Sequence, residues 1–215
     1  MKRVYIYCEG QTEEAFVNTV LYPYFQMQDI YVFPIICTTK RSVGRKYRGG
    51  VADYGKIKRE LRFLCRSHPH ELVTTLFDYY AMPADTPGIQ HSIGELTERI
   101  GAAEAAVDAD IGEANCRFNF MVHEFEALLF SQPAVFELIA SSAVVAELEA
   151  IRQAYPTPEH INRSAATAPS KRILSLIPRY RKVGDGVPLA QCIGIDIMRH
   201  ECPHFRAWTE RVIHW

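Results

Sequence analysis

The sequence lacks the features that mark membrane, secreted and disulfide-stabilised proteins. No apolar run approaches the roughly 20 residues that cross a bilayer, and the N-terminus lacks the basic, apolar and small-residue order of a signal peptide. The six cysteines form no C-x-x-C pair and lie dispersed in apolar segments, a pattern typical of reduced, mostly buried thiols. These absences predict a cytoplasmic protein that does not associate with membranes.

The sequence also has little excess charge. Its 215 residues carry a formal net charge of -1, and 48% of them are hydrophobic, which describes a globular protein without a strong overall field for nucleic acid or lipid. Any polyanion must therefore bind to a local patch. The length suffices for one well-buried core, or for a main domain with a smaller appendage.

Four apolar segments have the length and composition of strands. The predicted strands are residues 4–8, 31–37, 72–77 and 118–123. Apolar residues at helical spacing lie between them. Thr12 is the expected N-cap of the first helix, which Pro23 is expected to bend or end. Pro34 indicates that the second strand lies at a sheet edge or is irregular, and Ile93 is the first apolar residue of the third predicted helix.

The alternation of strand and helix sets the expected fold class. A β-α-β-α-β-α-β order favours an α/β fold with a mostly parallel sheet, right-handed crossovers and flanking helices. Beyond Pro133 the hydrophobic spacing becomes helical, and no convincing strand remains. We therefore expect an α/β domain at residues 1–132 and a helical C-terminal extension at residues 133–215 packed on it.

Acidic side chains stand where three of the predicted strands end. Glu9 follows the first strand, Asp78 the third, and Glu124 with Glu126 the fourth. Open α/β sheets bind ligands at the carboxyl ends of their strands, and clustered carboxylates there suit a hard divalent cation. Because no cysteines and histidines have zinc spacing, the oxygen ligands favour Mg²⁺ or Mn²⁺. Such cations polarise phosphoryl oxygens, so phosphoester cleavage or transfer is the natural chemistry.

Simpler explanations compete for the same acids. Glu13 lies one helical turn beyond Glu9 and would face the same crevice, but an acid in the first turn of a helix also complements the macrodipole. Asp78 would serve equally as a cap of the following turn. Glu124 and Glu126 share a face if the backbone is extended. If helix has begun they lie about 200° apart, and then only one of them is a ligand.

One histidine and two basic stretches are further candidates for contact with phosphate. His123 would hold a phosphate oxygen, move a proton or ligate a metal, although a histidine at a strand end more often forms structural hydrogen bonds. The basic stretches are residues 40–48, in a glycine-containing loop, and residues 171–182, where Pro169 suggests the start of a helix. Their composition suits a nucleic-acid backbone, but solvated surface is an equally good explanation.

Several segments resemble the Toprim-like family known as domain of unknown function 4276. The matching segments are Tyr7 to Glu14, Phe77 to Tyr80, His123 to Phe130, Thr167 to Arg172 and Cys202 to Phe205, so the resemblance covers nearly the whole chain. Toprim folds, found in topoisomerases, primases and OLD-type nucleases, are compact α/β sheets that bind Mg²⁺ through a Glu at the first strand and acids at later strand ends. The resemblance therefore implies a Toprim-like sheet with a Mg²⁺ site.

The resemblance also implies a role for each acid. Glu9 would be the primary acid, Asp78 stands where the first Asp of the D-x-D motif is found, and Glu124 or Glu126 would supply a further ligand. Tyr80 stands where the motif has its second acid. This departure puts a two-metal site in doubt, because a neutral tyrosine does not replace a carboxylate as a ligand.

A lysine is implied by the same resemblance. In OLD-type nucleases a lysine assists at the scissile phosphate, and Lys171 is the candidate for that role. The alternative for Lys171 is a surface lysine on an amphipathic helix.

Two functions of different classes follow. The first is a nuclease or other phosphodiesterase that depends on a divalent metal and acts on nucleic acid. The second is a non-catalytic or regulated partner subunit of a complex that contains an ATPase, because proteins of this kind resemble components of two-gene antiviral defence modules. Tyr80 favours the second, since a catalytic two-metal site should have kept an acid there.

Overall fold

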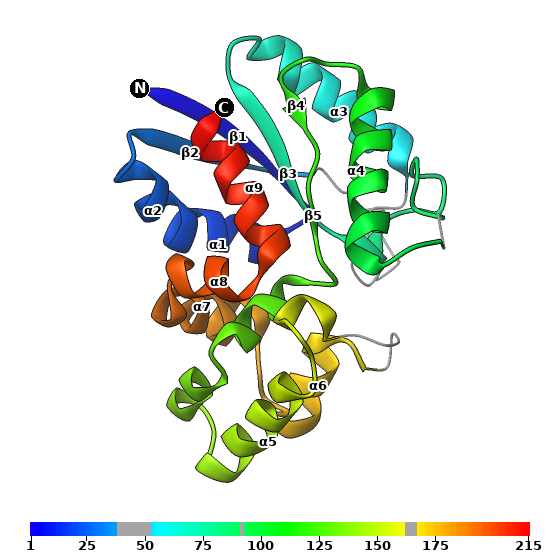
Figure 1. Ribbon diagram of the computed structural model, residues 1–215. Helices are drawn as coiled ribbons and strands as arrows, with labels where there is room; N and C mark the ends of the chain where they lie inside the picture. Colours follow the sequence, from blue (N-terminus) through cyan, green and yellow to red (C-terminus); the bar gives the residue numbers. More distant parts are fainter. Residues whose placement is uncertain (38–52, 91–92, 162–166) are drawn as a thin grey trace, which may run out of the picture.

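The fold is built on a parallel sheet whose strands match the predicted apolar segments. The computed structural model describes residues 1–37, 53–90, 93–161 and 167–215. The strands are β1 (Lys2–Cys8), β2 (Ile30–Ile36), β3 (Leu72–Asp78), β4 (Cys116–Arg117) and β5 (Phe120–Met121). Their order is β2-β1-β3-β4, β5 pairs with β3, and every pairing is parallel (Figure 1). The expected α/β class, a mostly parallel sheet flanked by helices, is confirmed.

The register of the two central strands places their carboxyl ends side by side. Val4 of β1 pairs with Leu72 of β3, and Cys8 pairs with Leu76. The residues that follow therefore emerge at the same edge of the sheet. Strand β2 pairs only with β1 among the described strands, so Pro34 lies in an edge strand as expected.

The first helical segment differs from its prediction in two details. It consists of α1 (Gln11–Phe16), the π-helical turn η1 (Val17–Leu21) and α2 (Tyr22–Gln26). The expectation that Thr12 caps it was wrong, because Gly10 is the N-cap and Thr12 lies within the first turn. The helix also continues past Pro23, which lies in the first turn of α2. The irregularity is η1, a wider turn that ends two residues before Pro23, whose nitrogen has no N–H to donate.

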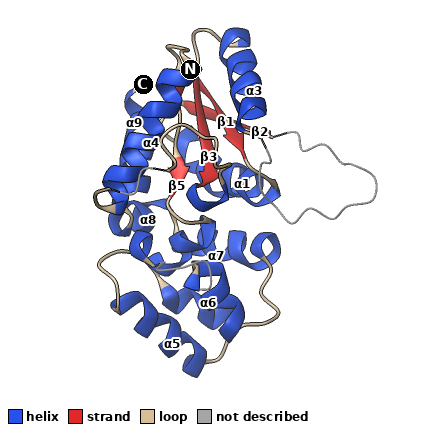
Figure 2. Cartoon of the chain, turned by 90° about the vertical axis from the view of Figure 1, so that its right-hand side faces the viewer, coloured by secondary structure: helices blue, strands red, loops and turns tan. Residues whose placement is uncertain are grey.

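Helices cover both faces of the sheet. One face packs on α3 (Tyr54–Ser67) and α4 (Leu96–Ile111), which bury side chains such as Leu61 and Ile100 against Phe77. The other face packs on α1, α2 and the C-terminal helix α9 (Pro203–His214), as Figures 1 and 2 show. Helix α4 begins at Leu96, and Ile93 lies before it with 91% of its surface exposed, so the predicted start was too early.

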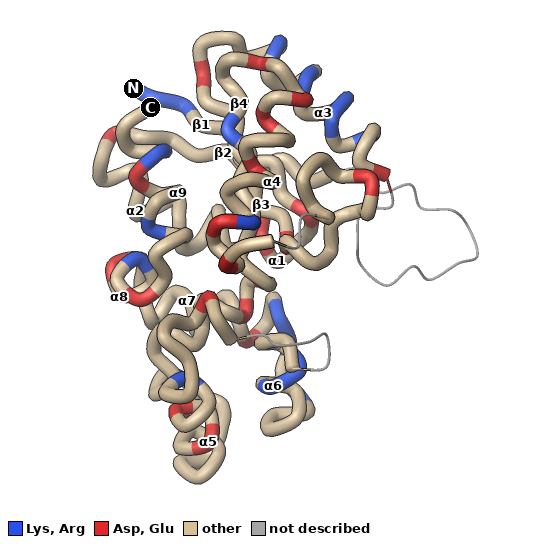
Figure 3. The backbone as a smooth tube through the Cα atoms, turned by 45° about the vertical axis from the view of Figure 1, so that its right-hand side comes forward, with Lys and Arg blue, Asp and Glu red and all other residues tan. Residues whose placement is uncertain are grey.

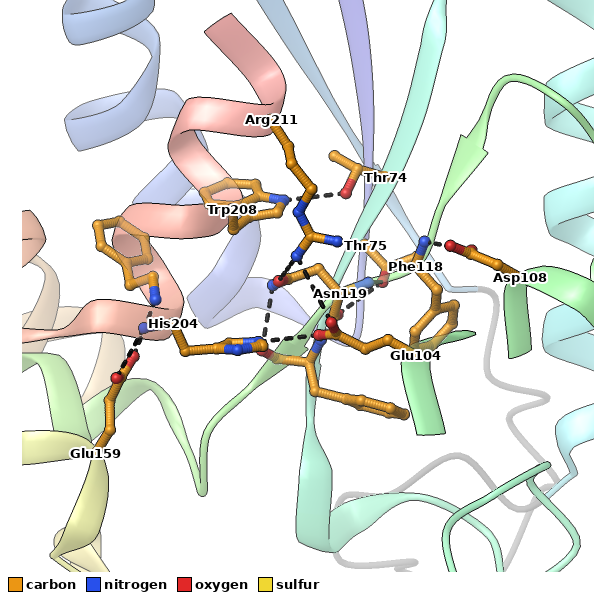
Figure 4. A network of polar contacts seen from close by, with 12 residues as sticks. Thr74, Thr75, Glu104, Asp108, Phe118, Asn119, Glu159, His204, Trp208 and Arg211 are labelled. Carbon is orange, nitrogen blue, oxygen red and sulfur yellow. Dashed lines mark hydrogen bonds and ion pairs between the residues drawn. The ribbon is translucent and has the colours of Figure 1, made fainter. Parts of the chain in front are cut away.

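Of the predicted strand 118–123 only β5 is formed, and a side chain interrupts the ladder between β4, which ends at Arg117, and β5. The Thr75 hydroxyl donates to the Asn119 carbonyl at 2.7 Å and accepts from the Asn119 N–H at 2.8 Å, so it replaces the backbone partner that a continuous ladder would supply (Figure 4). The Phe120 N–H is taken by the Glu104 carboxylate at 2.8 Å. Alternating apolar residues indicated a strand here, but side-chain hydrogen bonds from β3 and α4 interrupt it.

The remaining chain is helical, as expected. After the 3₁₀ turns η3 (Phe125–Ser131) and η4 (Pro133–Leu138) come α5 (Ser142–Gln153), the 3₁₀ turn η5 (Pro158–His160), α6 (Pro169–Leu176), the π-helical turn η7 (Lys182–Gly186), α7 (Val187–Ile193), α8 (Ile195–Glu201) and α9. A further 3₁₀ turn, η2 (Tyr79–Ala81), follows β3. Within the described ranges, no helix has the length and apolar character needed to cross a membrane.

Helix α9 returns to the sheet. The Trp208 indole donates to the Thr74 hydroxyl of β3 at 3.0 Å, and the ring is buried. His204, at the start of the same helix, lies 2.9 Å from Glu104 of α4 (Figure 4). The last helix of the sequence is thus part of the layer that covers the sheet, while the division into domains at residue 132 stays a prediction.

Candidate functional site

The acids predicted from β1 and β3 lie together at the carboxyl edge of the sheet. The Glu9 N–H donates to the Leu76 carbonyl at 3.2 Å, which continues the pairing of β1 with β3. The Glu9 carboxylate then turns back and accepts the Asp78 N–H at 3.2 Å. The register of two parallel strands therefore fixes Glu9 beside Asp78, as the sequence predicted.

Glu13 lies within the same acidic cluster and also has a structural role. Its carboxylate accepts the Gly10 N–H at 2.9 Å, an arrangement that closes the first turn of α1. The side chain is buried, and its charge helps to raise the pKa values of Glu9 and Asp78. The structure thus supports both explanations of Glu13. Its carboxylate closes the first turn of the helix, and it lies close to the strand-end acids.

Glu124 and Glu126 converge on one lysine ammonium. The backbone of Glu124 is extended, and the 3₁₀ turn η3 begins at the next residue. Lys182 Nζ lies 3.2 Å from Glu124 Oε2 and 2.9 Å from Glu126 Oε2. The extended residue at the junction therefore brings both side chains to one side, which decides between the two geometries that the sequence left open.

Burial makes this cluster of acids costly when it is ionised. Burial raises the pKa of Asp78 well above its ordinary value, and the charges of Glu9 and Glu13 raise it further. Burial likewise raises the pKa of Glu9, and it raises the pKa of Glu126 to about 7. Two oxygens of the cluster, Asp78 Oδ1 and Glu126 Oε1, are buried without a hydrogen-bond partner. The described residues therefore do not supply hydrogen-bond donors for all the carboxylate oxygens of the cluster.

Lys182 is the basic group that the fold brings to the acids. Burial alone would lower the pKa of its ammonium, but the charges of Glu126, Glu124 and Asp78 outweigh that effect and raise it. Lys171, the predicted lysine, is exposed on α6 and forms no ion pair with an acid in the described part of the chain. The sequence identified Lys182 only as one member of the stretch 171–182.

The other basic residues predicted to bind a polyanion have different positions. Arg172 donates to the Thr167 carbonyl at 2.8 Å and to the Tyr155 hydroxyl at 2.7 Å, so it stabilises its own helical region. Arg181 pairs with Asp185 at 3.1 Å. The predicted basic stretch at residues 40–48 lies outside the described residues.

His123 is held in a defined orientation against Tyr80. Its φ of 70° places it in the left-handed region, its side chain is buried, and its ring stacks on the Tyr80 ring with centroids 5.0 Å apart and planes at 6°. Burial lowers the pKa of His123 to about 4, so the imidazole is neutral at physiological pH. Tyr80 thus contacts the imidazole at the position where a second D-x-D acid would stand.

The side chains of the cluster offer the kind of ligand that a divalent cation needs. Carboxylate oxygens are the ligands that Mg²⁺ and Mn²⁺ prefer, and the two unpartnered buried oxygens with the raised pKa values fit a site that lacks positive charge. Among the residues with described positions, no three His, Cys, Asp or Glu side chains are gathered closely enough to hold an ion. The ligand chemistry fits, and binding would require the carboxylates to rotate toward one another.

Two solved structures align over nearly the whole chain, both of C-terminal regions of OLD proteins. The region from Burkholderia pseudomallei has 20% sequence identity, covers 99% of this chain and 97% of its own, and gives a TM-score of 0.44. The region from Xanthomonas campestris pv. campestris has 17% identity, covers 99% and 96%, and gives a TM-score of 0.36.

The family assignment rests on the sequence itself. No match was found among curated proteins. A family model matches residues 8–213, a range that contains every acid of the candidate site and Lys182. The resemblance noted in the separate segments is therefore confirmed, and the chain belongs to the family described as "Domain of unknown function (DUF4276)".

Proposed function

We propose that this protein is a phosphodiesterase that depends on a divalent cation and cleaves nucleic acid. The observation that carries the proposal is that two pairs of acids, Glu9 with Asp78 and Glu124 with Glu126, follow three strand ends of a parallel sheet, and the charges of Lys182 and Glu124 act on Asp78. These strand ends form the edge where open α/β sheets bind ligands. A purely structural cluster would be expected to satisfy its oxygens, whereas Asp78 and Glu126 each keep a buried oxygen without a partner.

In this proposal each acid has a role set by its position. Glu9, Asp78 and one of Glu124 and Glu126 would hold Mg²⁺ or Mn²⁺, while Glu13 remains the acid that closes the first turn of α1. When bound, the cation would supply a Lewis acid for a phosphoryl oxygen. The Glu9 carboxylate is oriented by the Asp78 N–H, so the two strand-end acids are positioned as a unit.

Lys182 would contact the phosphate of the substrate. A cluster of carboxylates repels a phosphodiester, and a cation on a partly exposed side chain offsets that repulsion. Lys182 has the right position, because its ammonium lies at the acids while 43% of the side chain remains exposed. We assign to Lys182 the role that the sequence suggested for Lys171. The neutral His123 ring would hold the Tyr80 ring in place by stacking on it.

The second candidate is a partner subunit that binds nucleic acid or a cation without catalysis, within a complex that contains an ATPase. Tyr80 is the observation that favours it. The residue is 56% exposed and stacks on His123, so the position of a second D-x-D acid is occupied by an aromatic contact. One cation at most would then be held, and a role in antiviral defence would depend on the partner.

A cleavage assay with matched variants distinguishes the two candidates. The protein is incubated with supercoiled plasmid, single-stranded DNA and RNA in Mg²⁺ or Mn²⁺, alone and with any ATPase encoded beside it. We expect cleavage that is lost in Glu9→Gln and Asp78→Asn and retained in Glu147→Gln, a control acid exposed on α5. A direct titration of Mn²⁺ followed by calorimetry gives a second readout on the same variants.

The outcomes separate cleanly. Cleavage that survives both site variants would mean that the activity comes from another site or a contaminant. Cation binding without cleavage on any nucleic acid, even with the ATPase present, would favour the partner subunit. Absence of both cation binding and cleavage would remove the proposed function altogether.

A further inference from the structure

Helix α3 has an exposed face that the proposed site does not use. The helix carries five basic residues and one acid between Tyr54 and Ser67, in a protein whose net charge is -1. Figure 3 shows Lys and Arg gathered along the outer side of this helix. The concentration of one sign of charge on a single helix marks α3 as a local patch of the kind that a nearly neutral protein needs to bind a polyanion.

The spacing of residues along α3 gives the helix a buried apolar face and an exposed basic face. Ile57, Leu61 and Cys65 repeat every four residues and are buried against the sheet. The opposite face presents Arg59 and Arg66, whose side chains are 72% and 69% exposed. Because the two faces diverge by about half a turn, the arginines are not needed for the packing of the helix.

Phe63 lies between these arginines and is 74% exposed. A large apolar side chain gains nothing for folding in this position, and isolated apolar residues on a surface are common. Here, however, Phe63 lines a hollow of about 370 Å³ together with Arg59, Arg62, Arg66 and Ser67. Guanidinium groups around an exposed aromatic ring form the combination that holds a phosphate backbone and stacks a base.

The arginines have partners that a phosphate would readily replace, with one exception. Arg66 contacts Glu113 at 2.8 Å and Arg59 contacts Asp53 at 4.0 Å, and exposed ion pairs of this kind contribute little to stability. Arg62 instead donates to the carbonyls of Ile111 and Asp110, at 2.7 and 3.1 Å. Arg62 is therefore held by backbone carbonyls, while Arg59 and Arg66 are available for a ligand.

From this arrangement we infer that the Arg59, Phe63 and Arg66 face of α3 binds single-stranded nucleic acid, with the backbone along the arginines and a base on Phe63. The inference rests on the proposed function only for its biological purpose, as a second contact for the strand that the acids would cleave. Helix α3 connects the carboxyl edge of β2 to the amino edge of β3, so its first turn begins at the edge where the acids lie. A strand on this face would lead toward the candidate site.

The test measures binding without cleavage. Fluorescence anisotropy is recorded with a labelled oligothymidylate in EDTA, so that neither a cation nor catalysis enters. We expect Phe63→Ala to weaken binding by about fivefold to a hundredfold, the range for loss of one stacked base. The same substitution should not change the affinity for an abasic strand of the same length, because that strand has no base to stack on Phe63. Met27→Ala, which removes another exposed apolar side chain (80% exposed), is the control and should have no effect.

The arginines are tested through the dependence on salt. For a single strand, each lost phosphate contact should reduce the slope of log K against log salt by about 0.7. We expect that reduction for Arg59→Gln and for Arg66→Gln, and no change for Arg206→Gln on the exposed side of α9. Arg59→Gln and Arg66→Gln change only exposed side chains, and circular dichroism verifies that all the variants are folded.

Each result bears on the inference separately from the function of the acids. Equal affinity for Phe63→Ala and Met27→Ala, no binding at all in EDTA, or equally tight binding of polyglutamate would overturn it. The last result would indicate an acidic protein partner. If the wild type binds through this face and cleaves nothing, the inference stands and the proposed phosphodiesterase fails. If the wild type cleaves nucleic acid and the α3 variants bind as tightly as wild type, the proposed phosphodiesterase stands and the inference about α3 fails.

Discussion

Lys182 Nζ lies 2.9 Å from Glu126 Oε2, across 56 residues of sequence and from a π-helical turn to a 3₁₀ turn. Glu126 is fully buried, while the lysine reaches it from the surface. The pair is therefore the point at which solvent, the buried acids and any incoming phosphate would meet. Its chemistry can be tested on the protein without knowledge of the substrate.

Removal of Lys182 should destabilise the protein in a manner that depends on pH. In Lys182→Met, Glu126 loses the cation that favours its ionised form, so its pKa should rise above about 7. At pH 8 we expect a loss of about 1 to 2 kcal/mol in the free energy of unfolding, as for a buried group left without its partner. At pH 5, where Glu126 is protonated, the loss should be smaller. Urea denaturation at both pH values measures it.

Lys171→Met is the matched control for this experiment. Lys171 is exposed on α6, and a substitution there should change the free energy of unfolding by less than about 0.5 kcal/mol at either pH. An equal effect of the two substitutions, or an effect of Lys182→Met that does not vary with pH, would contradict the assignment of the ion pair.

Glu126 itself should make the protein less stable as pH rises. Its pKa is raised by burial from 4.5 to about 7, so the favourable contribution of the protonated side chain is fully present below pH 4.5 and is lost as pH rises to about 7. A tenfold change in acid dissociation corresponds to about 1.4 kcal/mol. We therefore expect wild type to lose on the order of 3 kcal/mol relative to Glu126→Gln between pH 4.5 and pH 8. Parallel stability curves of wild type and Glu126→Gln would refute this.

Much of this site was predictable because it depends on strands. Glu9 and Asp78 follow continuous apolar runs, and parallel pairing brings the ends of such runs to one edge whatever the details of packing. The expected proximity of the two residues required only the order of the strands. The same reasoning located Glu124 and Glu126, though the interruption of the fourth strand by Thr75 was not visible in the apolar pattern.

The lysine was not predictable in the same way. Lys182 belongs to a turn of mixed composition, and its approach to Glu126 depends on how the C-terminal helices fold back on the sheet. The one local signal is Gly186, where the absence of a side chain allows Tyr180 to pack closely against the turn that carries the lysine. Helical periodicity identified the amphipathic face that holds Lys171, but it carries no information about which basic residue reaches a distant acid.

The buried Asp78 carboxylate should lower the stability of the folded protein when no cation is bound. Its pKa is raised by burial and by neighbouring acids, so its ionised form is unfavourable in the folded protein without a cation. Asp78→Asn should therefore raise the thermal midpoint at pH 8.5, by an amount equivalent to about 1 to 2 kcal/mol. Mn²⁺ should raise the midpoint of wild type and leave that of the variant unchanged. A variant that is less stable than wild type and still responds to Mn²⁺ would show that Asp78 is structural and not a ligand.

The turn that carries Lys182 should tolerate no side chain at Gly186. A Cβ there would overlap the Tyr180 hydroxyl and come within 3.2 Å of the Phe125 ring. Gly186→Ala should cost about 1 to 3 kcal/mol, as overpacking does. Tyr180→Phe should be nearly neutral, because that hydroxyl is buried without a hydrogen-bond partner.

The double variant tests whether the overlap is the cause. Tyr180→Phe removes the oxygen that the new methyl group would meet, so Gly186→Ala should cost less in that background, with a coupling free energy of about 0.5 to 3 kcal/mol in a double-mutant cycle. The pKa of Glu126, followed by NMR, should rise in Gly186→Ala as Lys182 is displaced and return toward about 7 in the double variant. Additive effects with no change in that pKa would mean that the turn does not position the lysine, and Lys182 would then reach the acids by its own flexibility.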